Sequence, residues 1–122
     1  MDYRSEVREM RRQNRRMYQL TGEAGVAQNT LYEKCMEDGA LDRKTKELIG
    51  IGIGICVRCD ACVYGHVEKA VQYGATIEEI AEVCKVGLIM GGGPGTHYSA
   101  KAIDCAEYYL KLKEEKEKLS EE

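Results

Sequence analysis

The chain has 122 residues, 18 of them Lys or Arg and 21 Asp or Glu, with a formal net charge of −3. This length is typical of one domain, residues 1–122, with a modest core. Trp and Phe are absent, so Ile, Leu, Val, Met and Tyr must build that core, and a core this light favours completion by a partner subunit. Acidic and basic residues are interleaved, which argues against nucleic-acid binding.

The N-terminus is charged from its start, and no apolar run approaches the roughly 20 residues that cross a bilayer. We therefore predict a cytoplasmic protein without membrane contact. Six cysteines in a secreted chain would favour a disulfide framework. Without a signal peptide they instead indicate reduced thiols, a metal site or a redox site.

Two helices are expected in the first third of the chain. Residues 3–20 predict a basic, amphipathic helix with six arginines, which we expect to dock on its own or a neighbouring subunit rather than on phosphate or RNA. A break at residues 21–25 precedes a shorter helix, expected from Asn29 to Glu37. Cys35 lies in that helix and is predicted to be a small buried hydrophobe.

Isoleucine and glycine alternate through residues 49–55. A period of two is typical of a strand, and each glycine costs about 1 kcal/mol relative to Ala in a helix. We nevertheless predict a helix over residues 42–55, capped by Asp42, because the flanking residues are helical and no second strand candidate is available for pairing. The glycines would then allow very close helix packing.

Residues 56–66 hold half of the cysteines and one of the two histidines. Cys59 and Cys62 form a C-x-x-C pair, and His66 follows four residues later. In a helix that begins near Cys59, these three side chains share one face. The N–H groups of the first turn would stabilise a thiolate, and the imidazole one turn on can exchange the Cys62 proton. The segment therefore indicates dithiol–disulfide chemistry.

A helical hairpin would bring Glu47 to this segment. If residues 42–55 and 59–73 are antiparallel, then at about 1.5 Å per residue Glu47 lies roughly 14 Å from the turn and His66 roughly 12 Å. Cys62 lies about one turn nearer the loop. Glu47, His66 and Cys62 could then form a relay in which the carboxylate orients the imidazole and the imidazole activates the thiol.

Two further helices are expected in the last third of the chain. Thr76 and Glu79 form a capping box before the first of them. Its buried face is predicted to contain Ile77, Ile80, Ala81, Cys84 and Leu88. Residues 91–95 should end it as a tight turn rather than a phosphate cradle, and the last helix should begin at Thr96. Within it we expect Cys105 in the core, His97 on the surface, and a charged end that frays.

One combination of residues in the chain is specific. It consists of Glu47, the pair Cys59-x-x-Cys62 after eleven intervening residues, and His66 after three more residues. A Gly-Ala-Thr-Ile-Glu-Glu-Ile segment and a Gly-Gly-Gly-Pro turn follow it. Together they resemble the carboxymuconolactone decarboxylase family, and within it the alkylhydroperoxidase D-like, thiol-active branch, over roughly residues 30–110. The resemblance implies an all-α fold of about six helices, assembly into homotrimers or homohexamers, and peroxidase or disulfide-reductase activity.

Carried over residue by residue, the resemblance makes Cys59 and Cys62 the redox pair and Glu47 and His66 the proton relay, without a cofactor or metal. The expected partners are a hydroperoxide or disulfide substrate and an external thiol reductant. Some peroxidase members have a histidine where this chain has Ala61, which favours disulfide reduction here. Decarboxylase members generally lack the cysteine pair, so lactone decarboxylation is not expected. The helix N-terminus favours Cys59 as the attacking thiol, whereas the histidine favours Cys62.

Two other interpretations stay open. Cys56, Cys59, Cys62 and His66 have the spacing of bacterial iron–sulfur loops, with His in place of the last Cys, and could also hold zinc. Metal binding needs a folded-back loop, whereas redox chemistry needs a helix from Cys59 onward, with Cys56 either buried or a third exchanging thiol. Alternatively, the chain is a non-catalytic oligomeric helical module whose thiols do not cycle.

Overall fold

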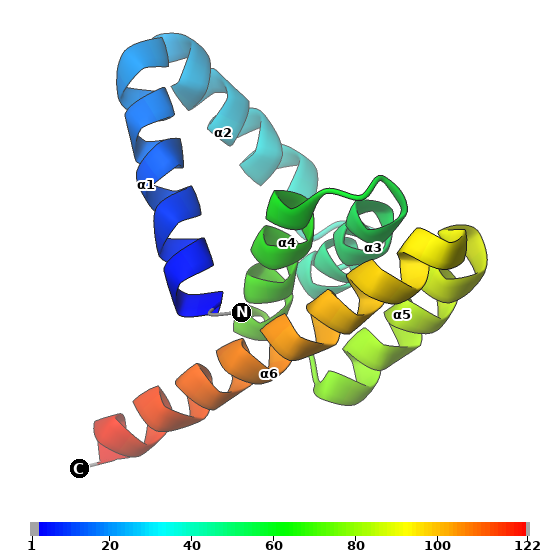
Figure 1. The fold of residues 1–122 in the computed structure, drawn as a ribbon. Coiled ribbons are helices and arrows are strands. Elements are labelled where there is room, and N and C mark those ends of the chain that lie inside the picture. Colours follow the sequence, from blue (N-terminus) through cyan, green and yellow to red (C-terminus); the bar gives the residue numbers. More distant parts are fainter. Residues whose placement is uncertain (1–2, 122) are drawn as a thin grey trace. The chain divides into compact units, whose positions relative to one another are not determined.

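The computed structural model describes residues 3–121, which form six α-helices and no strand (Figure 1). The helices are α1 (Tyr3–Thr21), α2 (Glu23–Met36), α3 (Arg43–Cys56), α4 (Asp60–Gln72), α5 (Ile77–Met90) and α6 (Gly92–Glu121). The predicted all-α fold of about six helices is confirmed. None of these helices is long and apolar enough to cross a membrane. The chain divides into two compact units at Ala40 and Leu41, so the single domain stays a prediction.

The first unit consists of α1 and α2, which meet at a turn at Gly22, where a φ of 55° favours glycine. The basic helix predicted over residues 3–20 is confirmed. The second helix starts at Glu23 rather than Asn29, because the break needs only one residue. Cys35 is exposed, so the prediction of a buried residue is wrong. Figure 1 shows the two helices of this unit diverging from their turn. Cys35 lies one residue before the end of α2 at Met36.

The helical hairpin of α3 and α4 begins the second unit. Asp42 caps α3 as predicted, since its carboxylate accepts the Thr45 N–H at 2.7 Å. The turn passes through Arg58, whose φ of 59° reverses the chain direction within three residues. Residues 49–55, in which isoleucine and glycine alternate, are helical, and their isoleucines therefore lie on two different faces of α3. Fully buried Ile51 and Ile55 belong to the core, whereas Ile49 and Ile53 are exposed.

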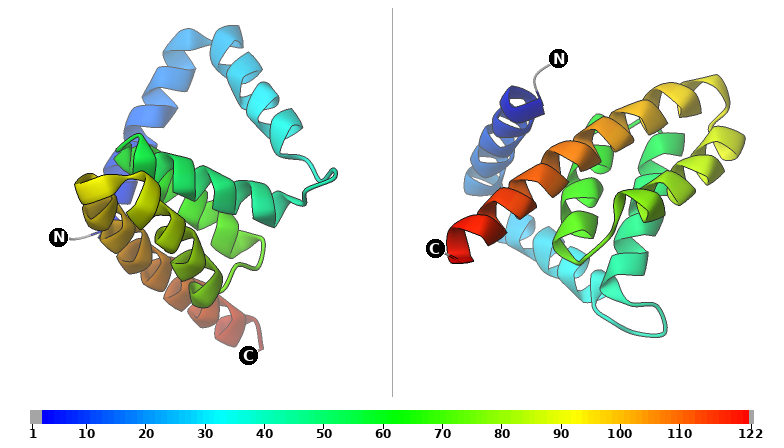
Figure 2. Two further views of the ribbon diagram at one scale, coloured as in Figure 1. Left: turned by 90° about the vertical axis from the view of Figure 1, so that its right-hand side faces the viewer. Right: turned by 90° about the horizontal axis from the view of Figure 1, so that it is seen from below.

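Helices α5 and α6 complete the core of the second unit (Figure 2). The predicted capping box is present, with Thr76 and Glu79 each accepting the other's backbone N–H. Cys84 and Cys105 are buried as predicted. Leu88, however, is 48% exposed, because the buried face of α5 continues through Gly87 instead. A Cβ atom at Gly87 would lie 3.0 Å from Ile55, so this glycine lets α3 and α6 pack closely against α5.

The glycine-rich segment after α5 is mostly helical. Gly91 caps α5, and α6 already begins at Gly92, four residues before the predicted start at Thr96. Pro94 lies in the first turn of α6. Backbone N–H groups there have no intrahelical hydrogen-bond partner, so the absence of an N–H on proline costs no hydrogen bond. The helix then continues to Glu121, and its C-terminal part extends past the other helices of this unit (Figures 1 and 2).

Candidate active site

Two glycines of α3 bring it against the face of α4 that carries the predicted site residues. A Cβ atom at Gly50 would lie 2.7 Å from Nδ1 of His66, and one at Gly54 would lie 3.2 Å from Cβ of Cys62. Real Cβ atoms essentially never approach a neighbour as closely as the first of these distances. The glycines therefore let the imidazole of His66 and the Cβ atom of Cys62 lie directly on the backbone of α3.

Glu47 lies one turn before Gly50 and is fully buried. Its Oε1 is 2.8 Å from Nδ1 of His66, so the predicted placement of these two side chains is confirmed. Its Oε2 accepts a 2.8 Å hydrogen bond from Nε of Arg43, which is itself buried. Arg43 is not among the residues that the sequence predicted for the site. Its position four residues before Glu47, on the same face of a helix, was the signal that could have found it.

These contacts bear on where the imidazole of His66 carries its proton. An isolated buried carboxylate is costly, and a contacting guanidinium favours its charged form. A charged Glu47 can accept the Nδ1–H of His66 across this 2.8 Å contact, and a ring in that tautomer carries its lone pair on Nε2. The structure thus places a buried carboxylate against one ring nitrogen of His66.

The two cysteines lie at the N-terminus of α4. Cys59 is its N-cap, and the Cys59 sulfur accepts the backbone N–H of Cys62 at 3.1 Å. Burial, followed by the hydrogen bond to Cys59 and the charge of that residue, raises the pKa of Cys62 to about 11. Cys62 thus holds its proton at neutral pH. His66 lies one turn later on the same face of α4.

Cys56 and His97 are the remaining predicted candidates. Cys56 ends α3 and is half-buried, whereas His97 is exposed and makes an edge-to-face contact with Tyr98. Within residues 3–121, no group of three or more His, Cys, Asp or Glu side chains is arranged to hold a metal ion. The metal-binding alternative required a folded-back loop, and the structure has a helix from Asp60 onward instead.

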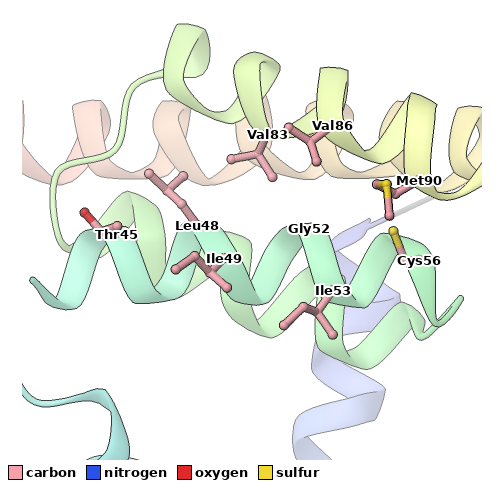
Figure 3. Close-up of a pocket in the computed structure, with 9 residues that line it drawn as sticks. All are labelled: Thr45, Leu48, Ile49, Gly52, Ile53, Cys56, Val83, Val86 and Met90. Carbon is pink, nitrogen blue, oxygen red and sulfur yellow. The ribbon is translucent and has the colours of Figure 1, made fainter. Parts of the chain in front are cut away.

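An apolar groove of about 450 Å³ lies between α3 and α5 (Figure 3). Its lining residues are Thr45, Leu48, Ile49, Gly52, Ile53, Cys56, Val83, Val86 and Met90. None of the four predicted site residues is among them. At 100° per residue, the groove-lining positions of α3 lie opposite Glu47, Gly50 and Gly54. The groove and the candidate site therefore occupy opposite sides of α3.

Comparison with known proteins places this geometry in a family. The sequence model of the carboxymuconolactone decarboxylase family matches residues 23–104. A protein of Cupriavidus necator is 34% identical over 102 residues, which are 84% of this chain and 90% of that protein.

Solved structures agree with this match. A carboxymuconolactone decarboxylase family protein from Legionella pneumophila, crystallised in the apo form, has a TM-score of 0.80 and 31% identity, over 84% of this chain and 92% of that one. A family member from Thermotoga maritima has a TM-score of 0.77 and 29% identity, over 89% and 93% of the two chains, and an involvement in the antioxidative response has been suggested for it. The chain therefore belongs to the carboxymuconolactone decarboxylase family.

Proposed function

We propose that the chain is a thiol-dependent oxidoreductase of the alkylhydroperoxidase D-like kind, which cycles Cys59 and Cys62 between dithiol and disulfide. One observation carries this proposal. The Cys59 sulfur contacts the backbone of Cys62 at the start of α4, on the hairpin that also holds the Glu47–His66 pair. The antioxidative role suggested for the Thermotoga maritima protein agrees with such an activity.

In the proposed reaction, Cys62 attacks and its proton passes to Nε2 of His66. With a hydroperoxide, the O–O bond breaks, the alcohol leaves with the proton from His66, and Cys62 becomes a sulfenic acid. Cys59 then attacks that sulfur, and water leaves as the disulfide forms. The substrate gains two electrons from the cysteine pair. An external dithiol returns them.

With a substrate disulfide, the same attack gives a mixed disulfide on Cys62 and releases the first thiol. Cys59 then displaces the second thiol, and the Cys59–Cys62 disulfide remains. Neutral Cys62 makes the base essential in both cases, because a thiol with a pKa of about 11 is almost entirely protonated near neutrality. Once ionised, such a high-pKa thiolate is a strong nucleophile.

The test is peptide mass mapping of the cysteines in anaerobically purified protein, before and after one equivalent of hydroperoxide or of a low-molecular-weight disulfide. We expect a Cys59–Cys62 disulfide that a dithiol reductant reverses. The Cys35→Ser variant is the matched control, because Cys35 is exposed and lies in the other unit. Full turnover by the double variant Cys59→Ser, Cys62→Ser would refute the proposal.

Single variants identify the attacking cysteine. Cys59→Ser should keep the first step and accumulate a sulfenic acid or a mixed disulfide on Cys62. Cys62→Ser should accumulate neither on Cys59. If the trapped adduct forms on Cys59 instead, the order of the two sulfurs is the reverse of the one proposed.

We also propose that the chain acts as a homotrimer or homohexamer, as the family resemblance implies. The exposed apolar residues around the groove support this proposal, since contiguous apolar patches on a surface mark interaction sites.

A further inference from the structure

We propose that Arg43 is a positioning residue for the thiol chemistry, because it holds buried Glu47 in the ionised form and thereby fixes His66 with its proton on Nδ1. The inference concerns the same site and rests on the proposed function for its consequence on turnover. The protonation state of His66 can be measured without any turnover. The two claims can therefore fail separately.

The first step is the burial of Glu47. Its side chain is fully buried, and a carboxylate removed from water takes up a proton unless a cation or several donors stabilise its charge. Arg43 supplies a cation with a 2.8 Å hydrogen bond to Oε2. A pair of this kind is asymmetric, since removing one partner leaves the other charge buried and uncompensated.

The second step is the fixed position of the guanidinium. Its Cζ atom lies 4.7 Å from the centre of the Tyr73 ring, within the range of a cation–π contact. Tyr73 is the C-cap of α4, so Arg43 contacts both helices of the hairpin. The planar guanidinium can stack on the ring and still direct Nε towards Glu47, which a lysine ammonium cannot do in the same way.

The third step concerns the other charged groups nearby. Glu47 contacts Arg43 from its own helix and His66 from α4. Lys44, the next residue along α3, pairs with Glu79 of α5 at 2.9 Å. On α6, Lys101 pairs with Asp60 at 3.1 Å. These two lysines are therefore engaged with other carboxylates, whereas Arg43 directs its Nε to the oxygen of Glu47 opposite the imidazole.

Loss of Arg43 should therefore change the imidazole. A protonated Glu47 no longer offers an anion to Nδ1–H, and free histidine prefers its proton on Nε2. The Nε2 lone pair that takes the Cys62 proton is then lost from most molecules. Because Glu47 still ionises at higher pH, the defect should shrink as the pH rises.

The chain has only two histidines, so the test is ¹⁵N NMR of the imidazole nitrogens, with exposed His97 as the internal reference. Wild-type His66 should show the Nδ1–H tautomer. Arg43→Met should shift it towards Nε2–H, and Arg43→Lys, which keeps the charge, should restore much of the wild-type signal. Lys44→Met is the matched control, since it removes a cation from the same turn of α3 but not from Glu47.

A pH profile of single-turnover disulfide formation provides the second readout. We expect Arg43→Met to lower the rate about tenfold or more near neutral pH and to approach the wild-type rate at alkaline pH. A merely structural role would lower the rate by the same factor throughout. The double variant Arg43→Met, Glu47→Gln removes both buried charges and keeps the comparison possible if Arg43→Met alone does not fold. Its His66 should show the same tautomer as His66 in the single variant Glu47→Gln.

An Arg43→Met protein that folds and keeps the wild-type tautomer and titration of His66 would overturn the inference. If the tautomer changes as expected but the wild-type protein forms no Cys59–Cys62 disulfide, the proposed function fails and the role of Arg43 in the cluster stands.

Discussion

Gly50 is the residue at which α3 makes room for the imidazole of His66. In Gly50→Ala, the new methyl group would lie 2.7 Å from the ring, so the ring must move away from Glu47. We expect a slower single-turnover reaction, even though alanine raises helix propensity by about 1 kcal/mol. Stopped-flow kinetics and a thermal melt measure the two effects separately.

Gly52→Ala is the control for this change. The nearest neighbour of its new methyl group, at 3.4 Å, is Val83 of α5, which lies on the side of α3 away from His66. It should keep the wild-type rate and gain stability. A Gly50→Ala protein that reacts as fast as wild type would show that the close approach of α3 to His66 is unnecessary for the chemistry.

The thiol of Cys62 should show the effect of its surroundings directly. Its pKa is raised to about 11, so alkylation by iodoacetamide should be slow at neutral pH and should accelerate as the pH rises towards that value. Cys59→Ala removes the second and third causes of the shift but leaves the burial, so the pKa of Cys62 should fall while staying above 9.0. Alkylation rates measured by peptide mass spectrometry over a pH series decide this. Rapid labelling of Cys62 in the wild-type protein at neutral pH would contradict the environment described here.

At the scale of the elements, the hairpin and the capped starts of α3 and α5 could be predicted from the sequence, whereas the starts of α2 and α6 could not. The regular rise of a helix was enough to place Glu47 beside His66, because both lie at similar distances from a short turn. The starts of α2 and α6 were misplaced, because Gly and Pro were interpreted as breaks although they are tolerated in a first turn. Arg43 was not predicted because the full burial of Glu47, which makes a cationic partner necessary, follows only from the packing of α3 on α4.

The capping box of α5 offers a test of local sequence as a source of stability. The Thr76 hydroxyl accepts the Glu79 N–H at 3.1 Å, and the Glu79 carboxylate accepts the Thr76 N–H at 2.9 Å. Thr76→Ala should therefore lower the free energy of unfolding by about 1 kcal/mol. Urea denaturation measures this change, with exposed Thr96→Ala in α6 as the control. Equal stability of the two variants would show that the cap contributes nothing.

At the scale of the whole molecule, the proposed homo-oligomer requires an apolar contact surface, and the groove between α3 and α5 offers one. Ile53 is 58% exposed there and Met90 is 71% exposed, and both side chains line the groove (Figure 3). We propose that a second copy of the chain covers this face. Ile53→Glu should then lower the mass measured by light scattering at a given concentration, because it places a charge in the contact.

Leu31→Glu, at a residue of α2 with 63% exposure, is the control and should leave the mass unchanged. An unchanged mass for Ile53→Glu would exclude the groove as the contact. The groove lies on the side of α3 opposite Glu47, so a dissociated Ile53→Glu protein should still hold His66 in the Nδ1–H tautomer. The thiol reaction of this variant then shows whether the cysteine pair needs only its own hairpin or also the assembly. If the dissociated variant still forms the disulfide, all the groups that the reaction requires lie in one chain.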